Sequence, residues 1–230
     1  MISIIIPTLN ESENLRLLLS DLLPQTVEKE IIVVDAESTD ATQEIAKDTG
    51  VKLLTSPRGR GQQLAQGVAS SSGDLLLFLH ADCRFPADGL SLLEQELEKN
   101  TEAIGGNFAL KFAGEDKFSR WLTGFYARIR KLGLYYGDSG IFIRSQSLHE
   151  LGGINQLAMM EDYDLVKRME KSSGKTLCID AVTLVTSSRR FDGRSFVGIF
   201  SGWVMMHFFY WLGISGKTLA RIYDSERCRN

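Results

Sequence analysis

Short apolar runs alternate with longer segments of helical periodicity through the first hundred residues. The runs that predict strands lie at residues 3–6, 31–34, 51–54 and 75–79. Helices are expected at residues 15–23, 40–49, 61–70 and 88–100, with start and stop signals that include Pro24, Asp40 and Gly50. This alternation is typical of an α/β fold in which helices cover both faces of a mixed, mostly parallel sheet.

The pattern becomes less regular after residue 100. Strands are expected at residues 104–112, 140–144 and 177–186, and helices at residues 116–132 and 161–172. No repeat, low-complexity tract or long linker divides the sequence, so we expect a single domain over residues 1–230. It would consist of a first half at 1–100, a second half at 101–190 and an apolar helical region at 191–230.

Charge and cysteine content exclude some functions and indicate a compartment. The net charge is -3 and the pI is about 5.7, whereas a nucleic-acid-binding surface usually brings a basic excess. We therefore expect no nucleic-acid partner. The three cysteines, Cys83, Cys178 and Cys228, are widely scattered, which favours a reducing compartment and a cytoplasmic protein.

Residues 196–215 form an apolar stretch without a charged side chain. Roughly twenty apolar residues can span a bilayer, but this stretch includes His207 and several glycines and serines. We therefore favour an interfacial or buried helix over a true span. Two partners are open for it: a peripheral contact with the inner face of the membrane, or a second copy of the chain in a homodimer.

Polar clusters follow each of the first four expected strands, at residues 7–11, 35–40, 56–61 and 80–84. In sheets of this kind, ligands bind beyond the carboxyl ends of the strands. We therefore expect these four clusters to meet at one edge of the sheet. Asp35, at the end of a buried strand, can bind a base or a ribose there, whereas the residues after it are also explained as helix caps.

Acidic residues at two positions are candidates for catalysis. Asp82, just past the fourth strand, can hold a divalent cation that bridges two phosphates, although turn and cap aspartates are also common at such places. His80 is either a second ligand or a packed histidine. Glu161 and Asp162 open a helix; they are either dipole-stabilising caps or a general base beside an orienting carboxylate.

Basic residues are expected to face phosphate groups. Arg58 and Arg60 stand among glycines just before a helix that begins near Gly61, where backbone N–H groups and guanidinium groups suit phosphate oxygens. The spacing matches neither a Walker A loop nor a dinucleotide fingerprint, and a basic loop without a ligand is the alternative. Arg190 and its neighbour Arg189 follow the last expected strand and can reach the same phosphates.

Together these segments resemble glycosyltransferase family 2 on a GT-A fold. The matching pieces are Ile-Ile-Pro-Thr-Leu-Asn-Glu11, Val-Val-Asp-Ala-Glu-Ser-Thr-Asp40, His-Ala-Asp82 and Glu161-Asp162. The pieces Gly-Arg-Gly-Gln-Gln, Leu-His-Ala-Asp, Gly-Asp-Ser-Gly-Ile-Phe and Ser-Arg-Arg resemble a small single-domain bacterial subgroup. The resemblance makes residues 1–100 a nucleotide-binding half and residues 101–190 an acceptor half.

The resemblance implies a metal-assisted, inverting transfer from a nucleotide-diphosphate sugar. Asp162 would be the general base and Asp82 would hold Mg²⁺ or Mn²⁺. The residues implied for the nucleoside are Pro7, Thr8, Glu11 and Asp35, and those for the diphosphate are Arg190 and the arginines near Gly59. This chain departs from the family pattern at two positions of the implied donor site. Relatives have a second aspartate where it has Ala36, and an aspartate where it has His80.

The acceptor stays open as a sugar, a lipid or a small molecule. Aromatic residues can form its wall or belong to the core, namely Trp121, Phe125, Tyr126, Tyr135 and Tyr136. Two other functions are alternatives. One is a catalytically degenerate scaffold that binds nucleotide sugars or associates with a membrane. The other is a nucleotidyltransferase, for which a Gly-rich arginine loop is missing after the first strand.

Overall fold

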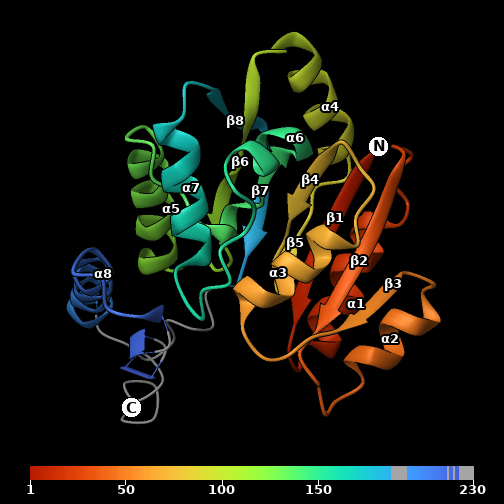
Figure 1. The fold of residues 1–230 in the computed structure, drawn as a ribbon, viewed down its shortest axis with the longest axis horizontal. Helices are drawn as coiled ribbons and strands as arrows, with labels where there is room; N and C mark the ends of the chain where they lie inside the picture. Colours follow the sequence, from red (N-terminus) through yellow and green to blue (C-terminus); the bar gives the residue numbers. More distant parts are fainter. Residues whose placement is uncertain (188–195, 217, 220, 223–230) are drawn as a thin grey trace.

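The computed structural model describes residues 1–187, 196–216, 218–219 and 221–222. One eight-stranded sheet forms its centre, with the order β3-β2-β1-β4-β7-β6-β8-β5 (Figure 1). The strands are β1 Ile2–Thr8, β2 Lys29–Asp35, β3 Lys52–Thr55, β4 Leu75–Phe78, β5 Cys83–Arg84, β6 Ala103–Phe112, β7 Ile141–Arg144 and β8 Lys175–Thr186. The expected α/β fold with a mixed, mostly parallel sheet is confirmed.

The first four strands are all parallel, whereas the second half of the sheet is mixed. β1 pairs with β2 and β4, and β2 with β3, all in parallel. β7 runs antiparallel to both β4 and β6, and it thereby joins the two halves of the sheet. Parallel pairing returns between β6 and β8, and the short β5 closes the sheet against β8. The carboxyl ends of β1, β2 and β4 therefore lie at one edge.

Helices cover both faces because the central strands are apolar on both sides. On β1, Ile4 and Ile6 pack into one core cluster, and Ile5 packs into the other. The first cluster includes residues of α1 Ser12–Leu22, α2 Thr42–Asp48 and α4 Gly89–Lys99. The second includes residues of α3 Arg60–Ala69, α6 Ser145–Glu150 and α7 Glu161–Lys171. Alternation along each strand thus assigns the two helical layers.

Two further helices, α5 Lys117–Arg130 and α8 Phe196–Trp211, lie to one side of this sandwich (Figure 1). Asp116 caps α5 by accepting from the backbone N–H groups of Phe118 and Ser119. Aromatic contacts join the two helices, with Phe125 and Trp203 stacked at 6.1 Å between centroids. Among the described residues, no helix combines the length and apolar character needed to cross a bilayer.

Three short elements were not predicted from the sequence: β5, α6 and a 3-10 turn at Gly137–Ser139. Each is too short to show a period. The turn is the one that matters for the site, because it follows the apolar segment after α5 and returns the chain into β7. Its glycines allow the chain to pass close to other segments, and Gly140 adopts a φ of +65° at its end.

Candidate active site

Asp35 organises the carboxyl edge of β1 and β2 from a fully buried position. Its carboxylate accepts from Thr8 Oγ1 at 3.0 Å, from the Ser38 backbone N–H at 2.9 Å and from Gln43 Nε2 at 2.7 Å. These bonds tie the end of β1 to the loop after β2. A buried carboxylate is tolerated here because donors from the chain surround it.

Gln63 fastens α3 to the same edge. Its side-chain amide donates to the backbone carbonyls of Thr8 at 2.9 Å and of Val34 at 2.7 Å, and all three groups are buried. The Thr8 carbonyl also accepts from the backbone N–H of Ala36 at 2.9 Å, so Gln63 adds a side-chain tie at the end of the β1–β2 pair. Gln63 was not predicted as a site residue, although it stands in the Gly-Arg-Gly-Gln-Gln segment quoted for the bacterial subgroup.

The loops after β1 and β2 hold one another through polar contacts. The backbone N–H of Asn10 donates to Ser38 Oγ at 2.8 Å, and that of Glu11 donates to Thr42 Oγ1 at 2.9 Å. Burial acts to raise the pKa of Asp40, but hydrogen bonds from Thr42 and Ser12 outweigh it and lower the pKa to about 2. The expected meeting of separate polar clusters at one edge is confirmed for these two.

Backbone strain concentrates around this edge. Within the described residues, a positive φ occurs in three non-glycine residues: 54° at Asn10, 59° at Glu37 and 68° at Met160. Asn10 and Glu37 lie in the two interlocked loops, and Met160 directly precedes Glu161. Such conformations cost about 1 to 3 kcal/mol each and persist where surrounding contacts enforce them. Their positions agree with a functional role for these segments.

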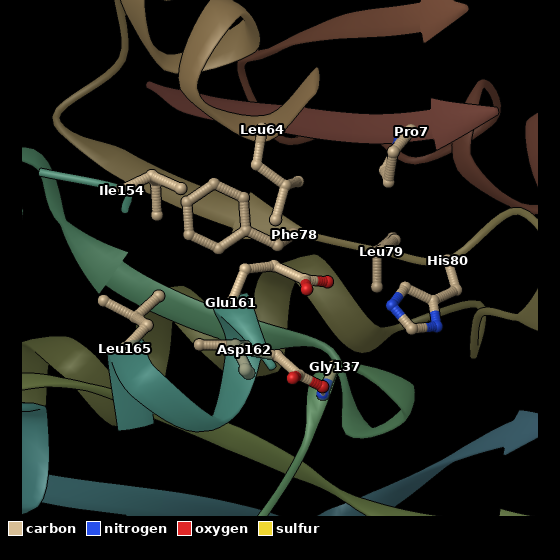
Figure 2. Close-up of a pocket in the computed structure, with 11 residues that line it drawn as sticks. Pro7, Leu64, Phe78, Leu79, His80, Gly137, Ile154, Glu161, Asp162 and Leu165 are labelled. Carbon is tan, nitrogen blue, oxygen red and sulfur yellow. Dashed lines mark hydrogen bonds between the residues drawn. The ribbon is translucent and has the colours of Figure 1, made fainter. Parts of the chain in front are cut away.

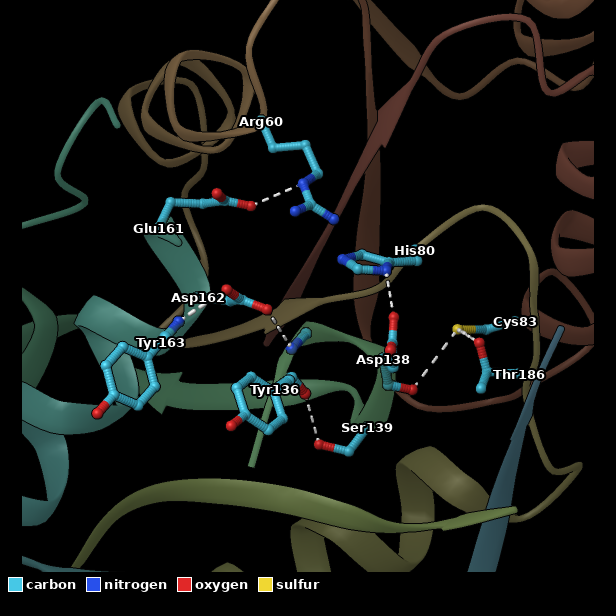
Figure 3. A network of polar contacts seen from close by, with 11 residues as sticks. Arg60, His80, Cys83, Tyr136, Asp138, Ser139, Glu161, Asp162, Tyr163 and Thr186 are labelled. Carbon is cyan, nitrogen blue, oxygen red and sulfur yellow. Dashed lines mark hydrogen bonds and ion pairs between the residues drawn. The ribbon is translucent and has the colours of Figure 1, made fainter. Parts of the chain in front are cut away.

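Glu161 is buried at the start of α7 and forms an ion pair across the site. Its Oε1 lies 2.8 Å from Arg60 Nε, at the start of α3 (Figure 3). Its Oε2 has no hydrogen-bond partner in the described part of the chain. Burial raises the pKa of Glu161; Arg60 opposes this change and Asp162 adds to it. An acceptor is thus available inside the site for a donor that none of the described residues supplies.

Asp162 is half-buried and its two carboxylate oxygens are held separately. Oδ2 accepts from the backbone N–H of Gly137 at 2.9 Å, and Oδ1 accepts from that of Tyr163 at 2.7 Å. Gly137 fits closely here: a Cβ on it would lie 2.6 Å from His80 Nε2 and 3.3 Å from Asp162 Oδ2. The turn therefore brings Asp162 and His80 close to the same glycine.

Asp138 orients His80 from below. His80 Nδ1 lies 3.0 Å from Asp138 Oδ1, so Nδ1 carries a proton and donates (Figure 3). In the neutral imidazole, Nε2 is then the acceptor, on the side of Gly137 and Asp162. Asp138 was not predicted as a site residue. Its signal was the Gly-Asp-Ser-Gly segment, but no feature of the sequence pairs this segment with His80.

These residues line one small pocket at the carboxyl edge (Figure 2). Its polar wall contains His80, Glu161 and Asp162, and its floor is apolar. The remaining lining residues are Pro7, Leu64, Phe78, Leu79, Gly137, Ile141, Ile154 and Leu165. Side chains from β1, α3, β4 and α7 therefore converge on a single site, as the carboxyl-edge rule predicts.

Three other candidates, Asp82, Arg58 and Gly61, are not among the residues that line this pocket. Asp82 is half-buried in the turn after β4, and none of the contacts among the described residues gives its carboxylate a hydrogen bond or an ion pair. Arg58 is exposed in the loop before α3. Gly61 packs closely, since a Cβ on it would lie 2.5 Å from the Leu157 carbonyl oxygen. Arg190 and Arg189 lie outside the described residues.

A metal ion at this edge would have few ligands from the chain itself. The described residues contain no cluster of three or more histidine, cysteine, aspartate or glutamate side chains suited to a metal. Asp82 nevertheless fits a cation that takes most of its other oxygens from a bound diphosphate and from water. Mg²⁺ commonly binds in this way, through one or two carboxylates.

Comparison with known proteins identifies the family. The model described as glycosyl transferase family 2 matches residues 3–151, which include the strands from β1 to β7 and the Asp82 turn. The chain belongs to glycosyl transferase family 2. The match ends before Glu161 and Asp162, so the assignment of the family does not depend on the carboxylate pair.

The match of this family 2 chain to its curated relatives spans less than half of their length. Glycosyltransferase AglE of Haloferax volcanii is 33% identical over 128 residues, which make up 51% of this chain and 40% of that protein. Mannosyltransferase PcManGT of Pyrobaculum calidifontis, solved with GDP-Man and Mn²⁺, has a TM-score of 0.64 at 18% identity; the match covers 80% of this chain and 56% of that one.

A second solved structure covers more of the family 2 chain. Glucosyl-3-phosphoglycerate synthase of Mycobacterium tuberculosis, with Mg²⁺ and UDP, has a TM-score of 0.64 at 19% identity. The match covers 93% of this chain and 80% of that one. At such identities the two structures establish the shared GT-A fold.

Proposed function

We propose that this chain transfers a sugar from a nucleotide-diphosphate donor to an acceptor hydroxyl, with inversion at the anomeric carbon and Asp162 as general base. The observation that carries the proposal is the position of Asp162 in the pocket, with both oxygens oriented by backbone N–H groups. Family membership supports the reaction class. The ligands of the two solved relatives, GDP-Man and UDP, support a nucleotide-sugar donor.

The donor is proposed to lie along the carboxyl edge of β1, β2 and β4. Its nucleoside would contact Pro7, Thr8, Glu11 and the loop that Asp35 holds in place. Because the Asp35 carboxylate already accepts bonds from Thr8, Ser38 and Gln43, its main contribution would be to fix this loop. The groups proposed for the diphosphate are Arg58, Arg60, Arg190 and the backbone at Gly61.

Asp82 is the proposed ligand of Mg²⁺ or Mn²⁺. A cation there neutralises charge on the departing diphosphate. His80 would help to orient the groups bound beside Asp82. Asp138 holds the His80 ring with Nε2 toward the pocket.

In the proposed reaction, the acceptor oxygen attacks the anomeric carbon while the bond from that carbon to the diphosphate oxygen breaks. Asp162 receives the proton of the acceptor hydroxyl. Glu161 presents its unpaired Oε2 as an acceptor for a sugar hydroxyl or for the incoming group. Arg60 balances the charge of Glu161 and remains close to the diphosphate.

The wider setting of the protein is part of the same proposal. We place it in the cytoplasm as one domain, with a nucleotide-binding half at residues 1–100 and an acceptor half at 101–190. The acceptor is a sugar, a lipid or a small molecule. The apolar C-terminal region is the proposed contact with a membrane or with a second copy.

Donor binding tests the proposal directly. Purified protein is titrated with UDP-, GDP- and dTDP-sugars in calorimetry, with and without Mn²⁺. We expect one nucleotide series to bind, and we expect the Mn²⁺-dependent part of its affinity to disappear in Asp82→Ala. The matched control is Asp88→Ala, at an exposed aspartate in the same connection before α4. It should bind the donor as the unmodified chain does.

Other outcomes would support other functions. A folded protein that binds none of these donors contradicts the proposed transfer. Donor binding without turnover on any acceptor or on water would support the degenerate scaffold. Release of pyrophosphate from a nucleoside triphosphate and a sugar phosphate would support the nucleotidyltransferase.

A further inference from the structure

α8 exposes a continuous line of large apolar side chains, which we name the α8 stripe. It consists of Phe200, Val204, Phe208, Trp211 and Leu212, with exposed fractions of 43%, 53%, 59%, 72% and 62%. Spacings of three and four residues place these side chains on one face of the helix. Isolated exposed apolar residues are ordinary, but a contiguous row on one helix marks an interaction surface.

The other face of α8 is firmly packed, so the α8 stripe is the outer face of a docked helix. Ile199 and Met206 are buried, and Trp203 stacks on Phe125 of α5. His207 Nε2 lies 3.0 Å from the Tyr136 hydroxyl, and Tyr210 donates to Asp164 at 3.0 Å. α8 has no charged residue, so it meets its surroundings through apolar and aromatic groups.

A cationic side chain lies beside one end of the α8 stripe, and a basic helix contacts the other end. At one end, Lys167 Nζ lies 5.7 Å from the centre of the Trp211 ring. At the other end, Phe200 contacts Phe125 of α5. α5 has four basic residues and no acidic one. Lys117, Arg120 and Arg128 are exposed.

We propose that the α8 stripe is a docking surface for an anionic lipid bilayer. The helix would lie in the plane of the interface with Phe208 and Trp211 among the upper acyl chains. Lys167 and Arg128 would meet lipid phosphates. An apolar face with flanking cations and aromatic residues is the chemistry that an anionic interface recognises.

Charge favours the bilayer over a second copy of the chain. If two copies met through their α8 stripes with the helices parallel, the cations at each end would face the same cations of the other copy. With the helices antiparallel, Lys167 of one copy would lie near the basic helix α5 of the other. Neither arrangement brings an acidic group to these cations from α8, because α8 has none. Lipid phosphates supply the missing negative charge.

The docking surface is connected to the candidate site through aromatic contacts. His207 of α8 packs against the Tyr163 ring at 4.7 Å, and Trp211 Nε1 donates to the Tyr163 hydroxyl at 3.2 Å. Tyr163 directly follows Asp162. A chain docked through α8 therefore holds its pocket near the membrane surface. The docking involves none of the groups proposed for the reaction. The docking and the proposed transfer are therefore tested independently.

Vesicle sedimentation tests the docking with the full chain. The probes are phosphatidylcholine vesicles with and without phosphatidylglycerol. We expect binding to the anionic vesicles, reduced at least tenfold in Phe208→Glu because an exposed aromatic that would enter the acyl chains is replaced by a charge. Arg128→Gln and Lys167→Gln should each lower binding to anionic vesicles about fivefold and leave binding to neutral vesicles unchanged. Leu17→Glu, at a residue of α1 that is 45% exposed, is the matched control and should bind normally.

Three results would overturn the docking. The first is no sedimentation of the unmodified chain with anionic vesicles. The second is unchanged binding by Phe208→Glu. The third, by sedimentation equilibrium without lipid, is a dimer that Phe208→Glu dissociates in a protein that binds no vesicles. Thermal melting shows whether each variant is folded, and donor titration of the same samples reports separately on the proposed transfer.

Discussion

The backbone N–H of Gly137 donates a hydrogen bond of 2.9 Å to Oδ2 of Asp162, across 25 residues of sequence. A main-chain donor is fixed more rigidly than a side chain, so it sets the carboxylate in one orientation. Gly137 also lies close to His80, which Asp138 holds in turn. One glycine thus lies against both the proposed base and the histidine of the donor edge.

Replacing Asp162 with asparagine should lower the rate of transfer about a hundredfold or more, because the proton acceptor is lost. The substitution keeps an oxygen that can accept from Gly137, so donor affinity should change little. Transfer is measured with the donor that calorimetry identifies, and donor affinity is measured on the same variant. Equal losses of affinity and rate would make Asp162 a donor-site residue. Asp88→Asn, near the start of α4, is the control for a surface carboxylate.

Gly137→Ala should reduce transfer about tenfold or more while the protein stays folded. The new Cβ would lie 2.6 Å from His80 Nε2, so His80 or the turn must move, and small displacements of reacting groups slow enzymes strongly. The control is Gly124→Ala in α5, whose Cβ would meet the Arg128 side chain at 3.4 Å. That change should stabilise the helix by up to ~1 kcal/mol. Unchanged kinetics in Gly137→Ala would refute this account of the turn.

Gln63→Leu should lower the free energy of unfolding by about 2 kcal/mol, because it removes two buried hydrogen bonds, to the carbonyls of Thr8 and Val34. Loosening of β1 and β2 should also weaken nucleotide binding. Gln66→Leu provides the matched control one turn along α3, where the amide donates to the Thr55 carbonyl at a more exposed place. Urea denaturation measures both variants. A similar loss in both would show that burial of Gln63 is unimportant.

Stability should depend on pH through Glu161. Burial raises the pKa of Glu161 above the ordinary 4.5. At a pH between 4.5 and this raised pKa, the folded protein keeps a proton that the unfolded chain releases. The free energy of unfolding therefore falls as pH rises through this window, and below pH 4.5 the contribution is constant. Glu161→Gln should remove this part of the slope in urea denaturation, while Glu150→Gln, at an exposed position, should not. Identical slopes for the unmodified chain and Glu161→Gln would contradict the prediction.

Much of the fold could be read from the sequence because its signals are local. Apolar runs such as residues 31–34 and 75–79 indicated β2 and β4 within one residue or a few, and helical periodicity indicated α1, α3 and α7. The same reasoning predicted that the loops containing Asn10 and Ser38 would meet, and their hydrogen bond confirms this.

Other parts had no such signal. The antiparallel position of β7 depends on pairing with β4 and β6, which no period in a single segment reveals. The short elements β5 and α6 contain too few residues for a pattern. For α8, the sequence showed an apolar stretch, but which of its faces is buried depends on α5 and α7.

The sequence by itself determined the order of the elements, the carboxyl edge and the candidate carboxylates Asp82, Glu161 and Asp162. These follow from side-chain periodicity and from motifs whose residues are neighbours in the chain. Only the tertiary structure joined Arg60 to Glu161, Asp138 to His80 and Gly137 to Asp162. These contacts join segments that are separate in the sequence. Their geometry is fixed only when the sheet closes and the helices pack on it, so no local propensity encodes the distances between the paired groups.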